Sequence, residues 1–121
     1  MSAESASLER QARDIVNVYH LTKMGNAAGI ATNGFRNGTG TYLTRSQRAG
    51  VWVSDRPLLI ESNIDPDDAV CFEVEIEEAA LAAFEWFEDG KPYREWLVSA
   101  EVLNGCRRRR LPEEELLSLF R

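Results

Sequence analysis

A strict alternation of apolar and acidic residues in the middle of the chain constrains its fold more than any other feature. Residues 69–76 read AVCFEVEI, and from Phe72 onward each apolar residue is followed by a glutamate or ends the run. Successive side chains of a strand point to opposite faces, so this segment has one buried and one solvated face. Such a pattern is typical of an antiparallel sheet packed on a core through one face.

The remainder of the chain supplies further short strands and short helices. Apolar-rich runs predict strands at residues 15–21, 50–54, 93–98 and 100–103. Helical patterns occupy residues 1–14, 24–33, 78–84 and 112–121. Gly34 follows the second of these helices, where a left-handed, helix-ending residue belongs. Short strands interrupted by short helices, without long crossover helices, predict an α+β fold.

Length and charge limit the classes of function. The 121 residues have the size of one ordinary domain, so residues 1–121 are expected to form a single one. The 14 basic and 20 acidic residues give a formal charge of −6, which argues against a general nucleic-acid or membrane-surface binder. No apolar run approaches the roughly 18–20 residues that span a bilayer, and the polar N-terminal segment is unlike a signal peptide. A cytoplasmic location is therefore expected.

Metal binding is not expected from the sequence. Cys71 and Cys106 form no CxxC pair, and His20 is the only histidine of the chain. A zinc site needs at least two further good ligands beside a single histidine.

Three short segments in a fixed order carry the strongest functional signal. They read VYHLT at 18–22, GVWVSD at 50–55 and REWLV at 94–98, and IATNGF at 30–35 lies between the first two. Their order and spacing resemble the ADP-ribosyltransferase superfamily, on its diphtheria-toxin and poly(ADP-ribose) polymerase side, over residues 18–103. The resemblance implies two small antiparallel sheets that form a cleft. It also implies NAD as the substrate, from which ADP-ribose is transferred to an acceptor.

The resemblance further implies roles for four residues. His20 matches the family histidine that hydrogen-bonds the adenine-side ribose of NAD, and Thr22 matches a threonine close to the same ribose. Trp52 stands in place of the aromatic residue that stacks on nicotinamide. Glu95 matches the catalytic glutamate, which hydrogen-bonds a hydroxyl of the nicotinamide ribose.

The chemistry of the reaction favours the same residue types. Breaking the nicotinamide–ribose bond develops positive charge on the sugar, and a carboxylate there stabilises this charge most when it appears. An aromatic face suits the flat pyridinium ring, with about 0.5–2 kcal/mol from the cation–π interaction. A neutral histidine offers a ribose one donor and one acceptor. Arg36, Arg45 and Arg48, which follow the helix at 24–33, are candidates to hold the pyrophosphate.

Departures from the family pattern leave other functions open. Leu21 stands where the family usually has glycine or tyrosine, and a bulky side chain there would narrow an adenosine pocket. One alternative is therefore a non-catalytic domain that binds NAD or ADP-ribose. For an active enzyme the acceptor is a protein, a nucleic acid or a small molecule. The short chain suits a toxin or effector, a role in which a neutralising protein partner is one option.

A second alternative is an interaction domain without nucleotide. The run Arg107–Arg110 lies between Gly105 and Pro112, which predicts a solvated terminal strand or turn. Docking of an acidic partner or of a nucleic-acid phosphate is the other interpretation of this run. Cys106 beside the arginines is a candidate reactive thiol with a lowered pKa.

Overall fold

The α+β class predicted from the sequence is confirmed. A computed structural model describes residues 14–41, 47–58 and 63–119. The strands are β1 (Ile15–Lys23), β2 (Gly38–Thr41), β3 (Gln47–Ser54), β4 (Ala69–Glu77), β5 (Glu85–Trp86), β6 (Glu95–Val98) and β7 (Arg107–Arg110). The helices are α2 (Met24–Asn33), α4 (Glu78–Leu81), α5 (Ala100–Asn104) and α6 (Glu113–Leu119), with short 3₁₀ turns η1 (Pro66–Asp68) and η2 (Ala82–Phe84).

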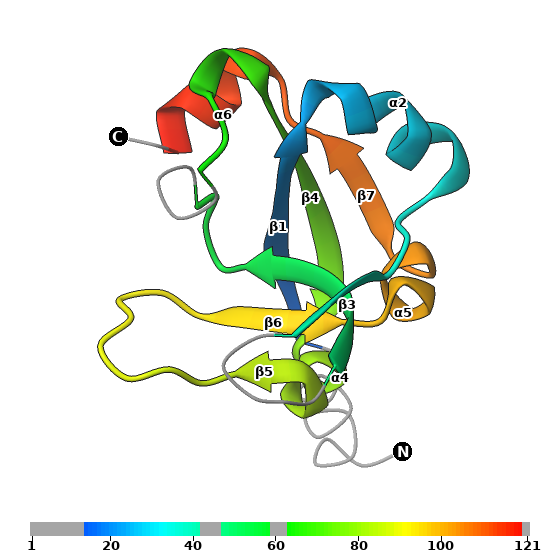
Figure 1. Ribbon diagram of the computed structural model, residues 1–121, viewed down its shortest axis with the longest axis vertical. Coiled ribbons are helices and arrows are strands. Elements are labelled where there is room, and N and C mark those ends of the chain that lie inside the picture. Colours follow the sequence, from blue (N-terminus) through cyan, green and yellow to red (C-terminus); the bar gives the residue numbers. More distant parts are fainter. Residues whose placement is uncertain (1–13, 42–46, 59–62, 120–121) are drawn as a thin grey trace, which may run out of the picture.

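The strands form one antiparallel sheet that changes direction in its middle. Their order is β5-β6-β3-β1-β4-β7, and β2 pairs with β3 outside this order. Strand β1 pairs with β4 over its whole length, whereas its register with β3 contains the single pair Tyr19–Ser54. Figure 1 shows β1, β4 and β7 side by side, with β3, β6 and β5 running across them. The expectation of two separate sheets is thus not confirmed, because hydrogen bonds join both halves.

The alternation in β4 places its apolar side chains in the core, as predicted. Phe72, Val74 and Ile76 are buried, and Glu75 and Glu77 are exposed. These apolar side chains belong to the main core cluster, which also receives buried residues from β1, β3, β6 and the helices. Each fully buried side chain of this size contributes about 1.5–3 kcal/mol to folding.

A second, smaller apolar cluster lies on the opposite face of β1 and β4. It contains Cys71, Leu111 and Leu116, and Tyr19 and Leu21 pack against it. Leu116 comes from α6, so this helix covers the cluster. Both faces of β1 are thus packed against apolar side chains. Val18 belongs to the main core cluster, and Tyr19 and Leu21 face the smaller one.

One predicted strand is wrong. Residues 100–103 lie in helix α5, although their composition favours a strand. The Oγ of Ser99 accepts a hydrogen bond from the backbone N–H of Val102, which caps the helix. The N–H of Ala100 donates to Oδ1 of Asn37, 2.8 Å away. A remote side chain therefore satisfies a backbone group that a strand would have used in its ladder.

The ends of the chain are described only in part. The predicted C-terminal helix is present as α6, and the predicted N-terminal helix at residues 1–14 lies almost entirely outside the described residues. In the part of the chain that the structure describes, no helix is long and apolar enough to cross a membrane.

The segment after α2 is held tightly against α5. Gly34 has φ 83° and ψ −178°, a region that is essentially restricted to glycine. The N–H of Phe35 donates to Oδ1 of Asn104 (2.8 Å), and Nδ2 of Asn104 donates to the carbonyl of Phe35 (3.0 Å). A Cβ on Gly34 would lie 2.6 Å from the same Oδ1. The positive φ expected for Gly34 is thus present, and close packing adds a second requirement for glycine.

We expect Gly34→Ala to lower the free energy of unfolding by about 1–3 kcal/mol, because alanine is strained at this φ and collides with Asn104. Gly29→Ala in the middle of α2 is the matched control. A Cβ there meets nothing within 4 Å, so the substitution should stabilise the protein by about 0.5–1 kcal/mol. Urea unfolding of both variants measures the difference, and equal stabilities would contradict the role of Gly34.

Candidate functional site

A cavity of about 1110 Å³ lies where the two halves of the sheet meet helix α2. Side chains of α2, β1, β3, β5 and β6 line it. Small-molecule sites usually occupy about 300–1,000 Å³, so this cavity has room for a ligand of dinucleotide size.

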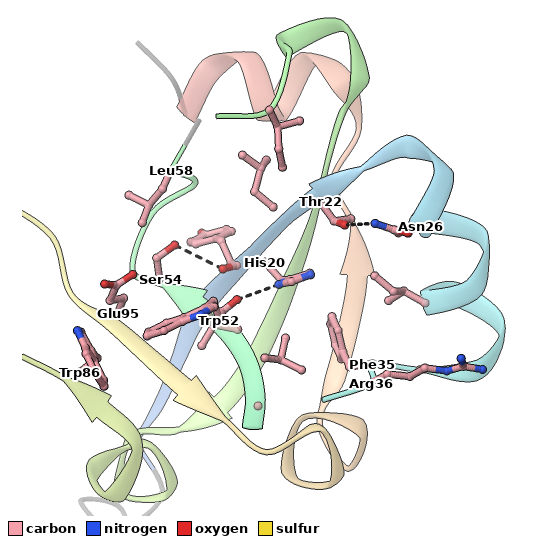
Figure 2. A pocket seen from close by; sticks show the side chains of 18 of the residues that line it. His20, Thr22, Asn26, Phe35, Arg36, Trp52, Ser54, Leu58, Trp86 and Glu95 are labelled. Atoms are coloured by element: carbon pink, nitrogen blue, oxygen red, sulfur yellow. Dashed lines mark hydrogen bonds between the residues drawn. The ribbon is translucent and has the colours of Figure 1, made fainter. Parts of the chain in front are cut away.

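The structure brings most of the residues predicted from the sequence to this one cavity. His20 and Thr22 from β1, Trp52 from β3, Glu95 from β6 and Arg36 after α2 all line it. Figure 2 shows Trp52 between His20 on one side and Glu95 with Trp86 on the other. Arg45 lies outside the described residues, as does the side chain of Arg48.

His20 is held by a backbone group of the neighbouring strand. Its Nδ1–H donates a hydrogen bond of 2.8 Å to the carbonyl oxygen of Trp52, and its ring meets the edge of Phe35 with centroids 5.4 Å apart. Burial lowers the pKa of His20 below its usual 6.5, although the bond to Trp52 acts in the opposite direction. The neutral ring therefore carries its proton on Nδ1 and offers Nε2 to a ligand as an acceptor.

Thr22 and Asn26 form a polar pair near the start of α2. The two side chains are joined by a hydrogen bond of 3.0 Å from Asn26 Nδ2 to Thr22 Oγ1. Thr22 is buried, and both residues line the cavity. Thr22 follows His20 by two positions on β1, so the two side chains share one face of the strand. Asn26 was not predicted from the sequence, because its role depends on the position of α2.

Strand register assembles the other end of the cavity. Glu95 pairs with Ser54 of β3 and with Trp86 of β5, and residues paired across strands point to the same face. Trp52, two positions before Ser54, shares this face, and its ring meets that of Trp86 edge to face at 5.7 Å. Trp86 was not predicted as a site residue, because a two-residue strand such as β5 is too short to show a periodic pattern.

The carboxylate of Glu95 is paired with a lysine that sequence reasoning also missed. Nζ of Lys91 lies 2.7 Å from Oε1 of Glu95 and donates to the carbonyl of Trp86 at 3.3 Å. The side chains of Lys91 and Glu95 are 10% and 18% exposed. Lys91 lies in the loop before β6 and Glu95 is the first residue of that strand, so helical periodicity gave no signal for this pair.

The structure defines the surroundings of Leu21 and of the arginine run. Leu21 touches the cavity, but it packs against the cluster under α6. Arg107–Arg110 form strand β7, paired with β4, and three of the four are exposed, which confirms the predicted solvated strand. Arg108 donates to the carbonyl of Ile30 at the end of α2, and Arg109 donates to Glu73 and to a glutamate of α6. Half of the run is therefore engaged within the protein.

The prediction of a lowered pKa for Cys106 is wrong. Burial, and then the negative charge of Glu77, raise the pKa of this thiol. Its Sγ also donates to the carbonyl of Val102 at 3.3 Å. A raised pKa keeps the thiol protonated, so the neighbouring arginines in the sequence do not make Cys106 a reactive thiolate.

Comparison with known proteins gives no relative for this chain. It matches no protein-family model, no curated protein and no solved structure. Across residues 14–41, 47–58 and 63–119, no three His, Cys, Asp or Glu side chains are grouped so as to hold a metal ion. The chemistry of the cavity is therefore argued from its own side chains.

We expect His20 to make stability depend on pH. The pKa of His20 is lower in the folded protein than in the unfolded chain, so the unfolded chain binds a proton more readily as pH falls below about 6.5. The free energy of unfolding that the neutral His20 contributes is therefore lost as pH decreases further. His20→Asn keeps an N–H donor for the carbonyl of Trp52 but does not titrate. The free energy of unfolding of the wild type relative to this variant should fall between pH 7 and pH 5, by at most about 1.4 kcal/mol per pH unit. A difference that is constant over this range would contradict a neutral buried imidazole.

Proposed function

We propose that the cavity binds NAD and that the protein is an ADP-ribosyltransferase, which breaks the nicotinamide–ribose bond and transfers ADP-ribose to an acceptor. One observation carries the proposal: His20, Trp52 and Glu95, which come from three strands remote in sequence, line a single cavity. These are the residues that the motif order assigned to NAD. Under this proposal, the halves β1-β4-β7 and β3-β6-β5 correspond to the two sheets of the family fold.

The two ends of the cavity differ in a way that suits NAD. The end near α2 offers hydrogen-bonding groups and the exposed guanidinium of Arg36, which fit a ribose and a pyrophosphate. The end near β5 and β6 offers the indoles of Trp52 and Trp86 beside the carboxylate of Glu95. Aromatic faces and a carboxylate suit a pyridinium ring and its attached ribose.

The proposed reaction begins with cleavage of the bond between the nicotinamide nitrogen and the sugar carbon. The bonding electron pair leaves with nicotinamide, which becomes neutral, and the sugar carbon becomes cationic. The carboxylate of Glu95 stabilises this charge through a ribose hydroxyl. A lone pair of the acceptor then forms the new bond to the sugar carbon, and the acceptor releases its proton to solvent. Water is the acceptor in simple hydrolysis, and a protein, nucleic acid or small molecule in transfer.

A second candidate is a domain that binds NAD or ADP-ribose without reaction. Leu21 favours it, because this bulky side chain touches the cavity where the family usually has glycine or tyrosine. The other alternative, an interaction domain built on the arginine run, has less support, since Arg108 and Arg109 are engaged within the protein.

Incubation of the wild type with NAD should release nicotinamide, and Glu95→Gln should slow the release by about 100-fold or more, because it removes a charge that acts in the transition state. The matched control is Glu75→Gln, an exposed glutamate of β4. Chromatographic assay of nicotinamide separates these outcomes. Equal release by wild type and Glu95→Gln would remove Glu95 from the mechanism.

NAD should raise the thermal unfolding midpoint of the wild type, since a ligand at 100 times its Kd stabilises the folded state by about 2.7 kcal/mol. Trp52→Ala should reduce this shift strongly and Trp52→Phe much less, because phenylalanine keeps an aromatic face. A shift without nicotinamide release identifies the non-catalytic binder. Absence of any shift in the wild type rejects both NAD-based functions.

A further inference from the structure

Lys91 is an unusual residue for its position. It belongs to the loop between β5 and β6, but its side chain is only 10% exposed. Because lysine is almost never buried without a partner, its ammonium needs partners here. Its ammonium contacts three groups: Oε1 of Glu95 at 2.7 Å, the carbonyl of Trp86 at 3.3 Å, and the ring of Tyr93 with Nζ 5.3 Å from the centroid. These contacts fix one end of a long and otherwise flexible side chain.

The direction from which Lys91 approaches Glu95 limits what it can do. Glu95, Trp86 and Tyr93 line the cavity, whereas Lys91 is not among the residues that line it. The ammonium therefore bonds to Oε1 without lining the cavity itself. A lysine that blocked the ligand would lie inside the cavity, so the arrangement is that of a support.

We infer that Lys91 is a positioning residue for Glu95: its ammonium holds Oε1 from outside the cavity and thereby aims Oε2 at the ligand. This inference rests on the proposed NAD-cleaving function. It differs from the family-derived assignments, which concern residues that touch NAD itself.

The energetics of the pair support a role beyond loop closure. An exposed ion pair contributes little to stability. The carboxylate of Glu95, however, is only 18% exposed and lies near the indoles of Trp52 and Trp86, so it loses hydration that a charged partner must replace. The shortest contact of Lys91 is to Glu95, and the bond to the carbonyl of Trp86 is longer. Lys91 therefore fixes a group whose displacement by about 1 Å would slow a positioned reaction by about 100-fold.

The test compares Lys91→Met, Lys91→Arg and Lys23→Met in nicotinamide release from NAD. Lys23, at the end of β1, is exposed and serves as the matched control. We expect Lys91→Met to lower kcat by about 10–100-fold with KM within about threefold of the wild type. Lys91→Arg, which keeps a cation, should restore at least part of kcat, and Lys23→Met should match the wild type. A role confined to folding would lower the amount of folded protein but leave kcat per folded molecule unchanged.

In the activity assay, two results would overturn the inference: an unchanged or higher kcat in Lys91→Met, or an equal loss in Lys91→Met and Lys91→Arg when both are folded by circular dichroism. Urea unfolding of Lys91→Met, Glu95→Gln and the double variant provides a readout without NAD. Positioning predicts that Glu95→Gln changes the unfolding midpoint less in the Lys91→Met background than in the wild type. Additive changes would reject the coupling of Lys91 to Glu95 whether or not NAD is cleaved. If the wild type releases no nicotinamide, the proposed function fails, and non-additive changes would then still support the fixed carboxylate.

Discussion

The contact between β1 and β3 is the constraint on which both the sheet and the cavity depend. The two strands share one ladder pair, and the side chain of His20 adds a further link between the halves of the sheet. Nδ1 of His20 donates to the carbonyl of Trp52, whereas the hydroxyl of Ser54 donates to the carbonyl of Arg56 at 2.5 Å and lies 3.4 Å from the carbonyl oxygen of Tyr19. Because buried backbone groups need partners, the bond from His20 gives the carbonyl of Trp52 a partner where the ladder between β1 and β3 is interrupted. The bond that joins the halves also fixes the tautomer of His20, so the geometry of the cavity and that of the sheet are inseparable.

Remote segments reinforce this arrangement through Phe35. The ring of Phe35 lies against His20, and Asn104 of α5 holds its backbone by two hydrogen bonds. The guanidinium of Arg108 lies over the same ring and donates to the last turn of α2. The C-terminal third of the chain thus supports a histidine near its beginning.

The elements with a strong local pattern were predictable, and those set by remote contacts were not. The alternation in β4 identified both its strand and its buried face. Residues 100–103 were misassigned as a strand because the contact that holds the first turn of α5 is remote. The side chain of Asn37, which is distant in sequence, accepts a hydrogen bond from this turn. The order of three motifs led to His20, Trp52 and Glu95, whereas Lys91 joins the site only through the register of β5 with β6. Motif order therefore identified groups that face the cavity, and their supports required the structure.

The two outer strands of the sheet have a consequence for self-association. An exposed strand edge is a template for pairing with another molecule, and natural proteins blunt such edges with short strands or charged side chains. Here β5 contains two residues and β7 consists entirely of arginines. Neither border offers a long, neutral template, and a second copy that approached β7 edge to edge would bring like charges together. The run that secures α2 through Arg108 and α6 through Arg109 thereby also opposes growth of the sheet at this edge.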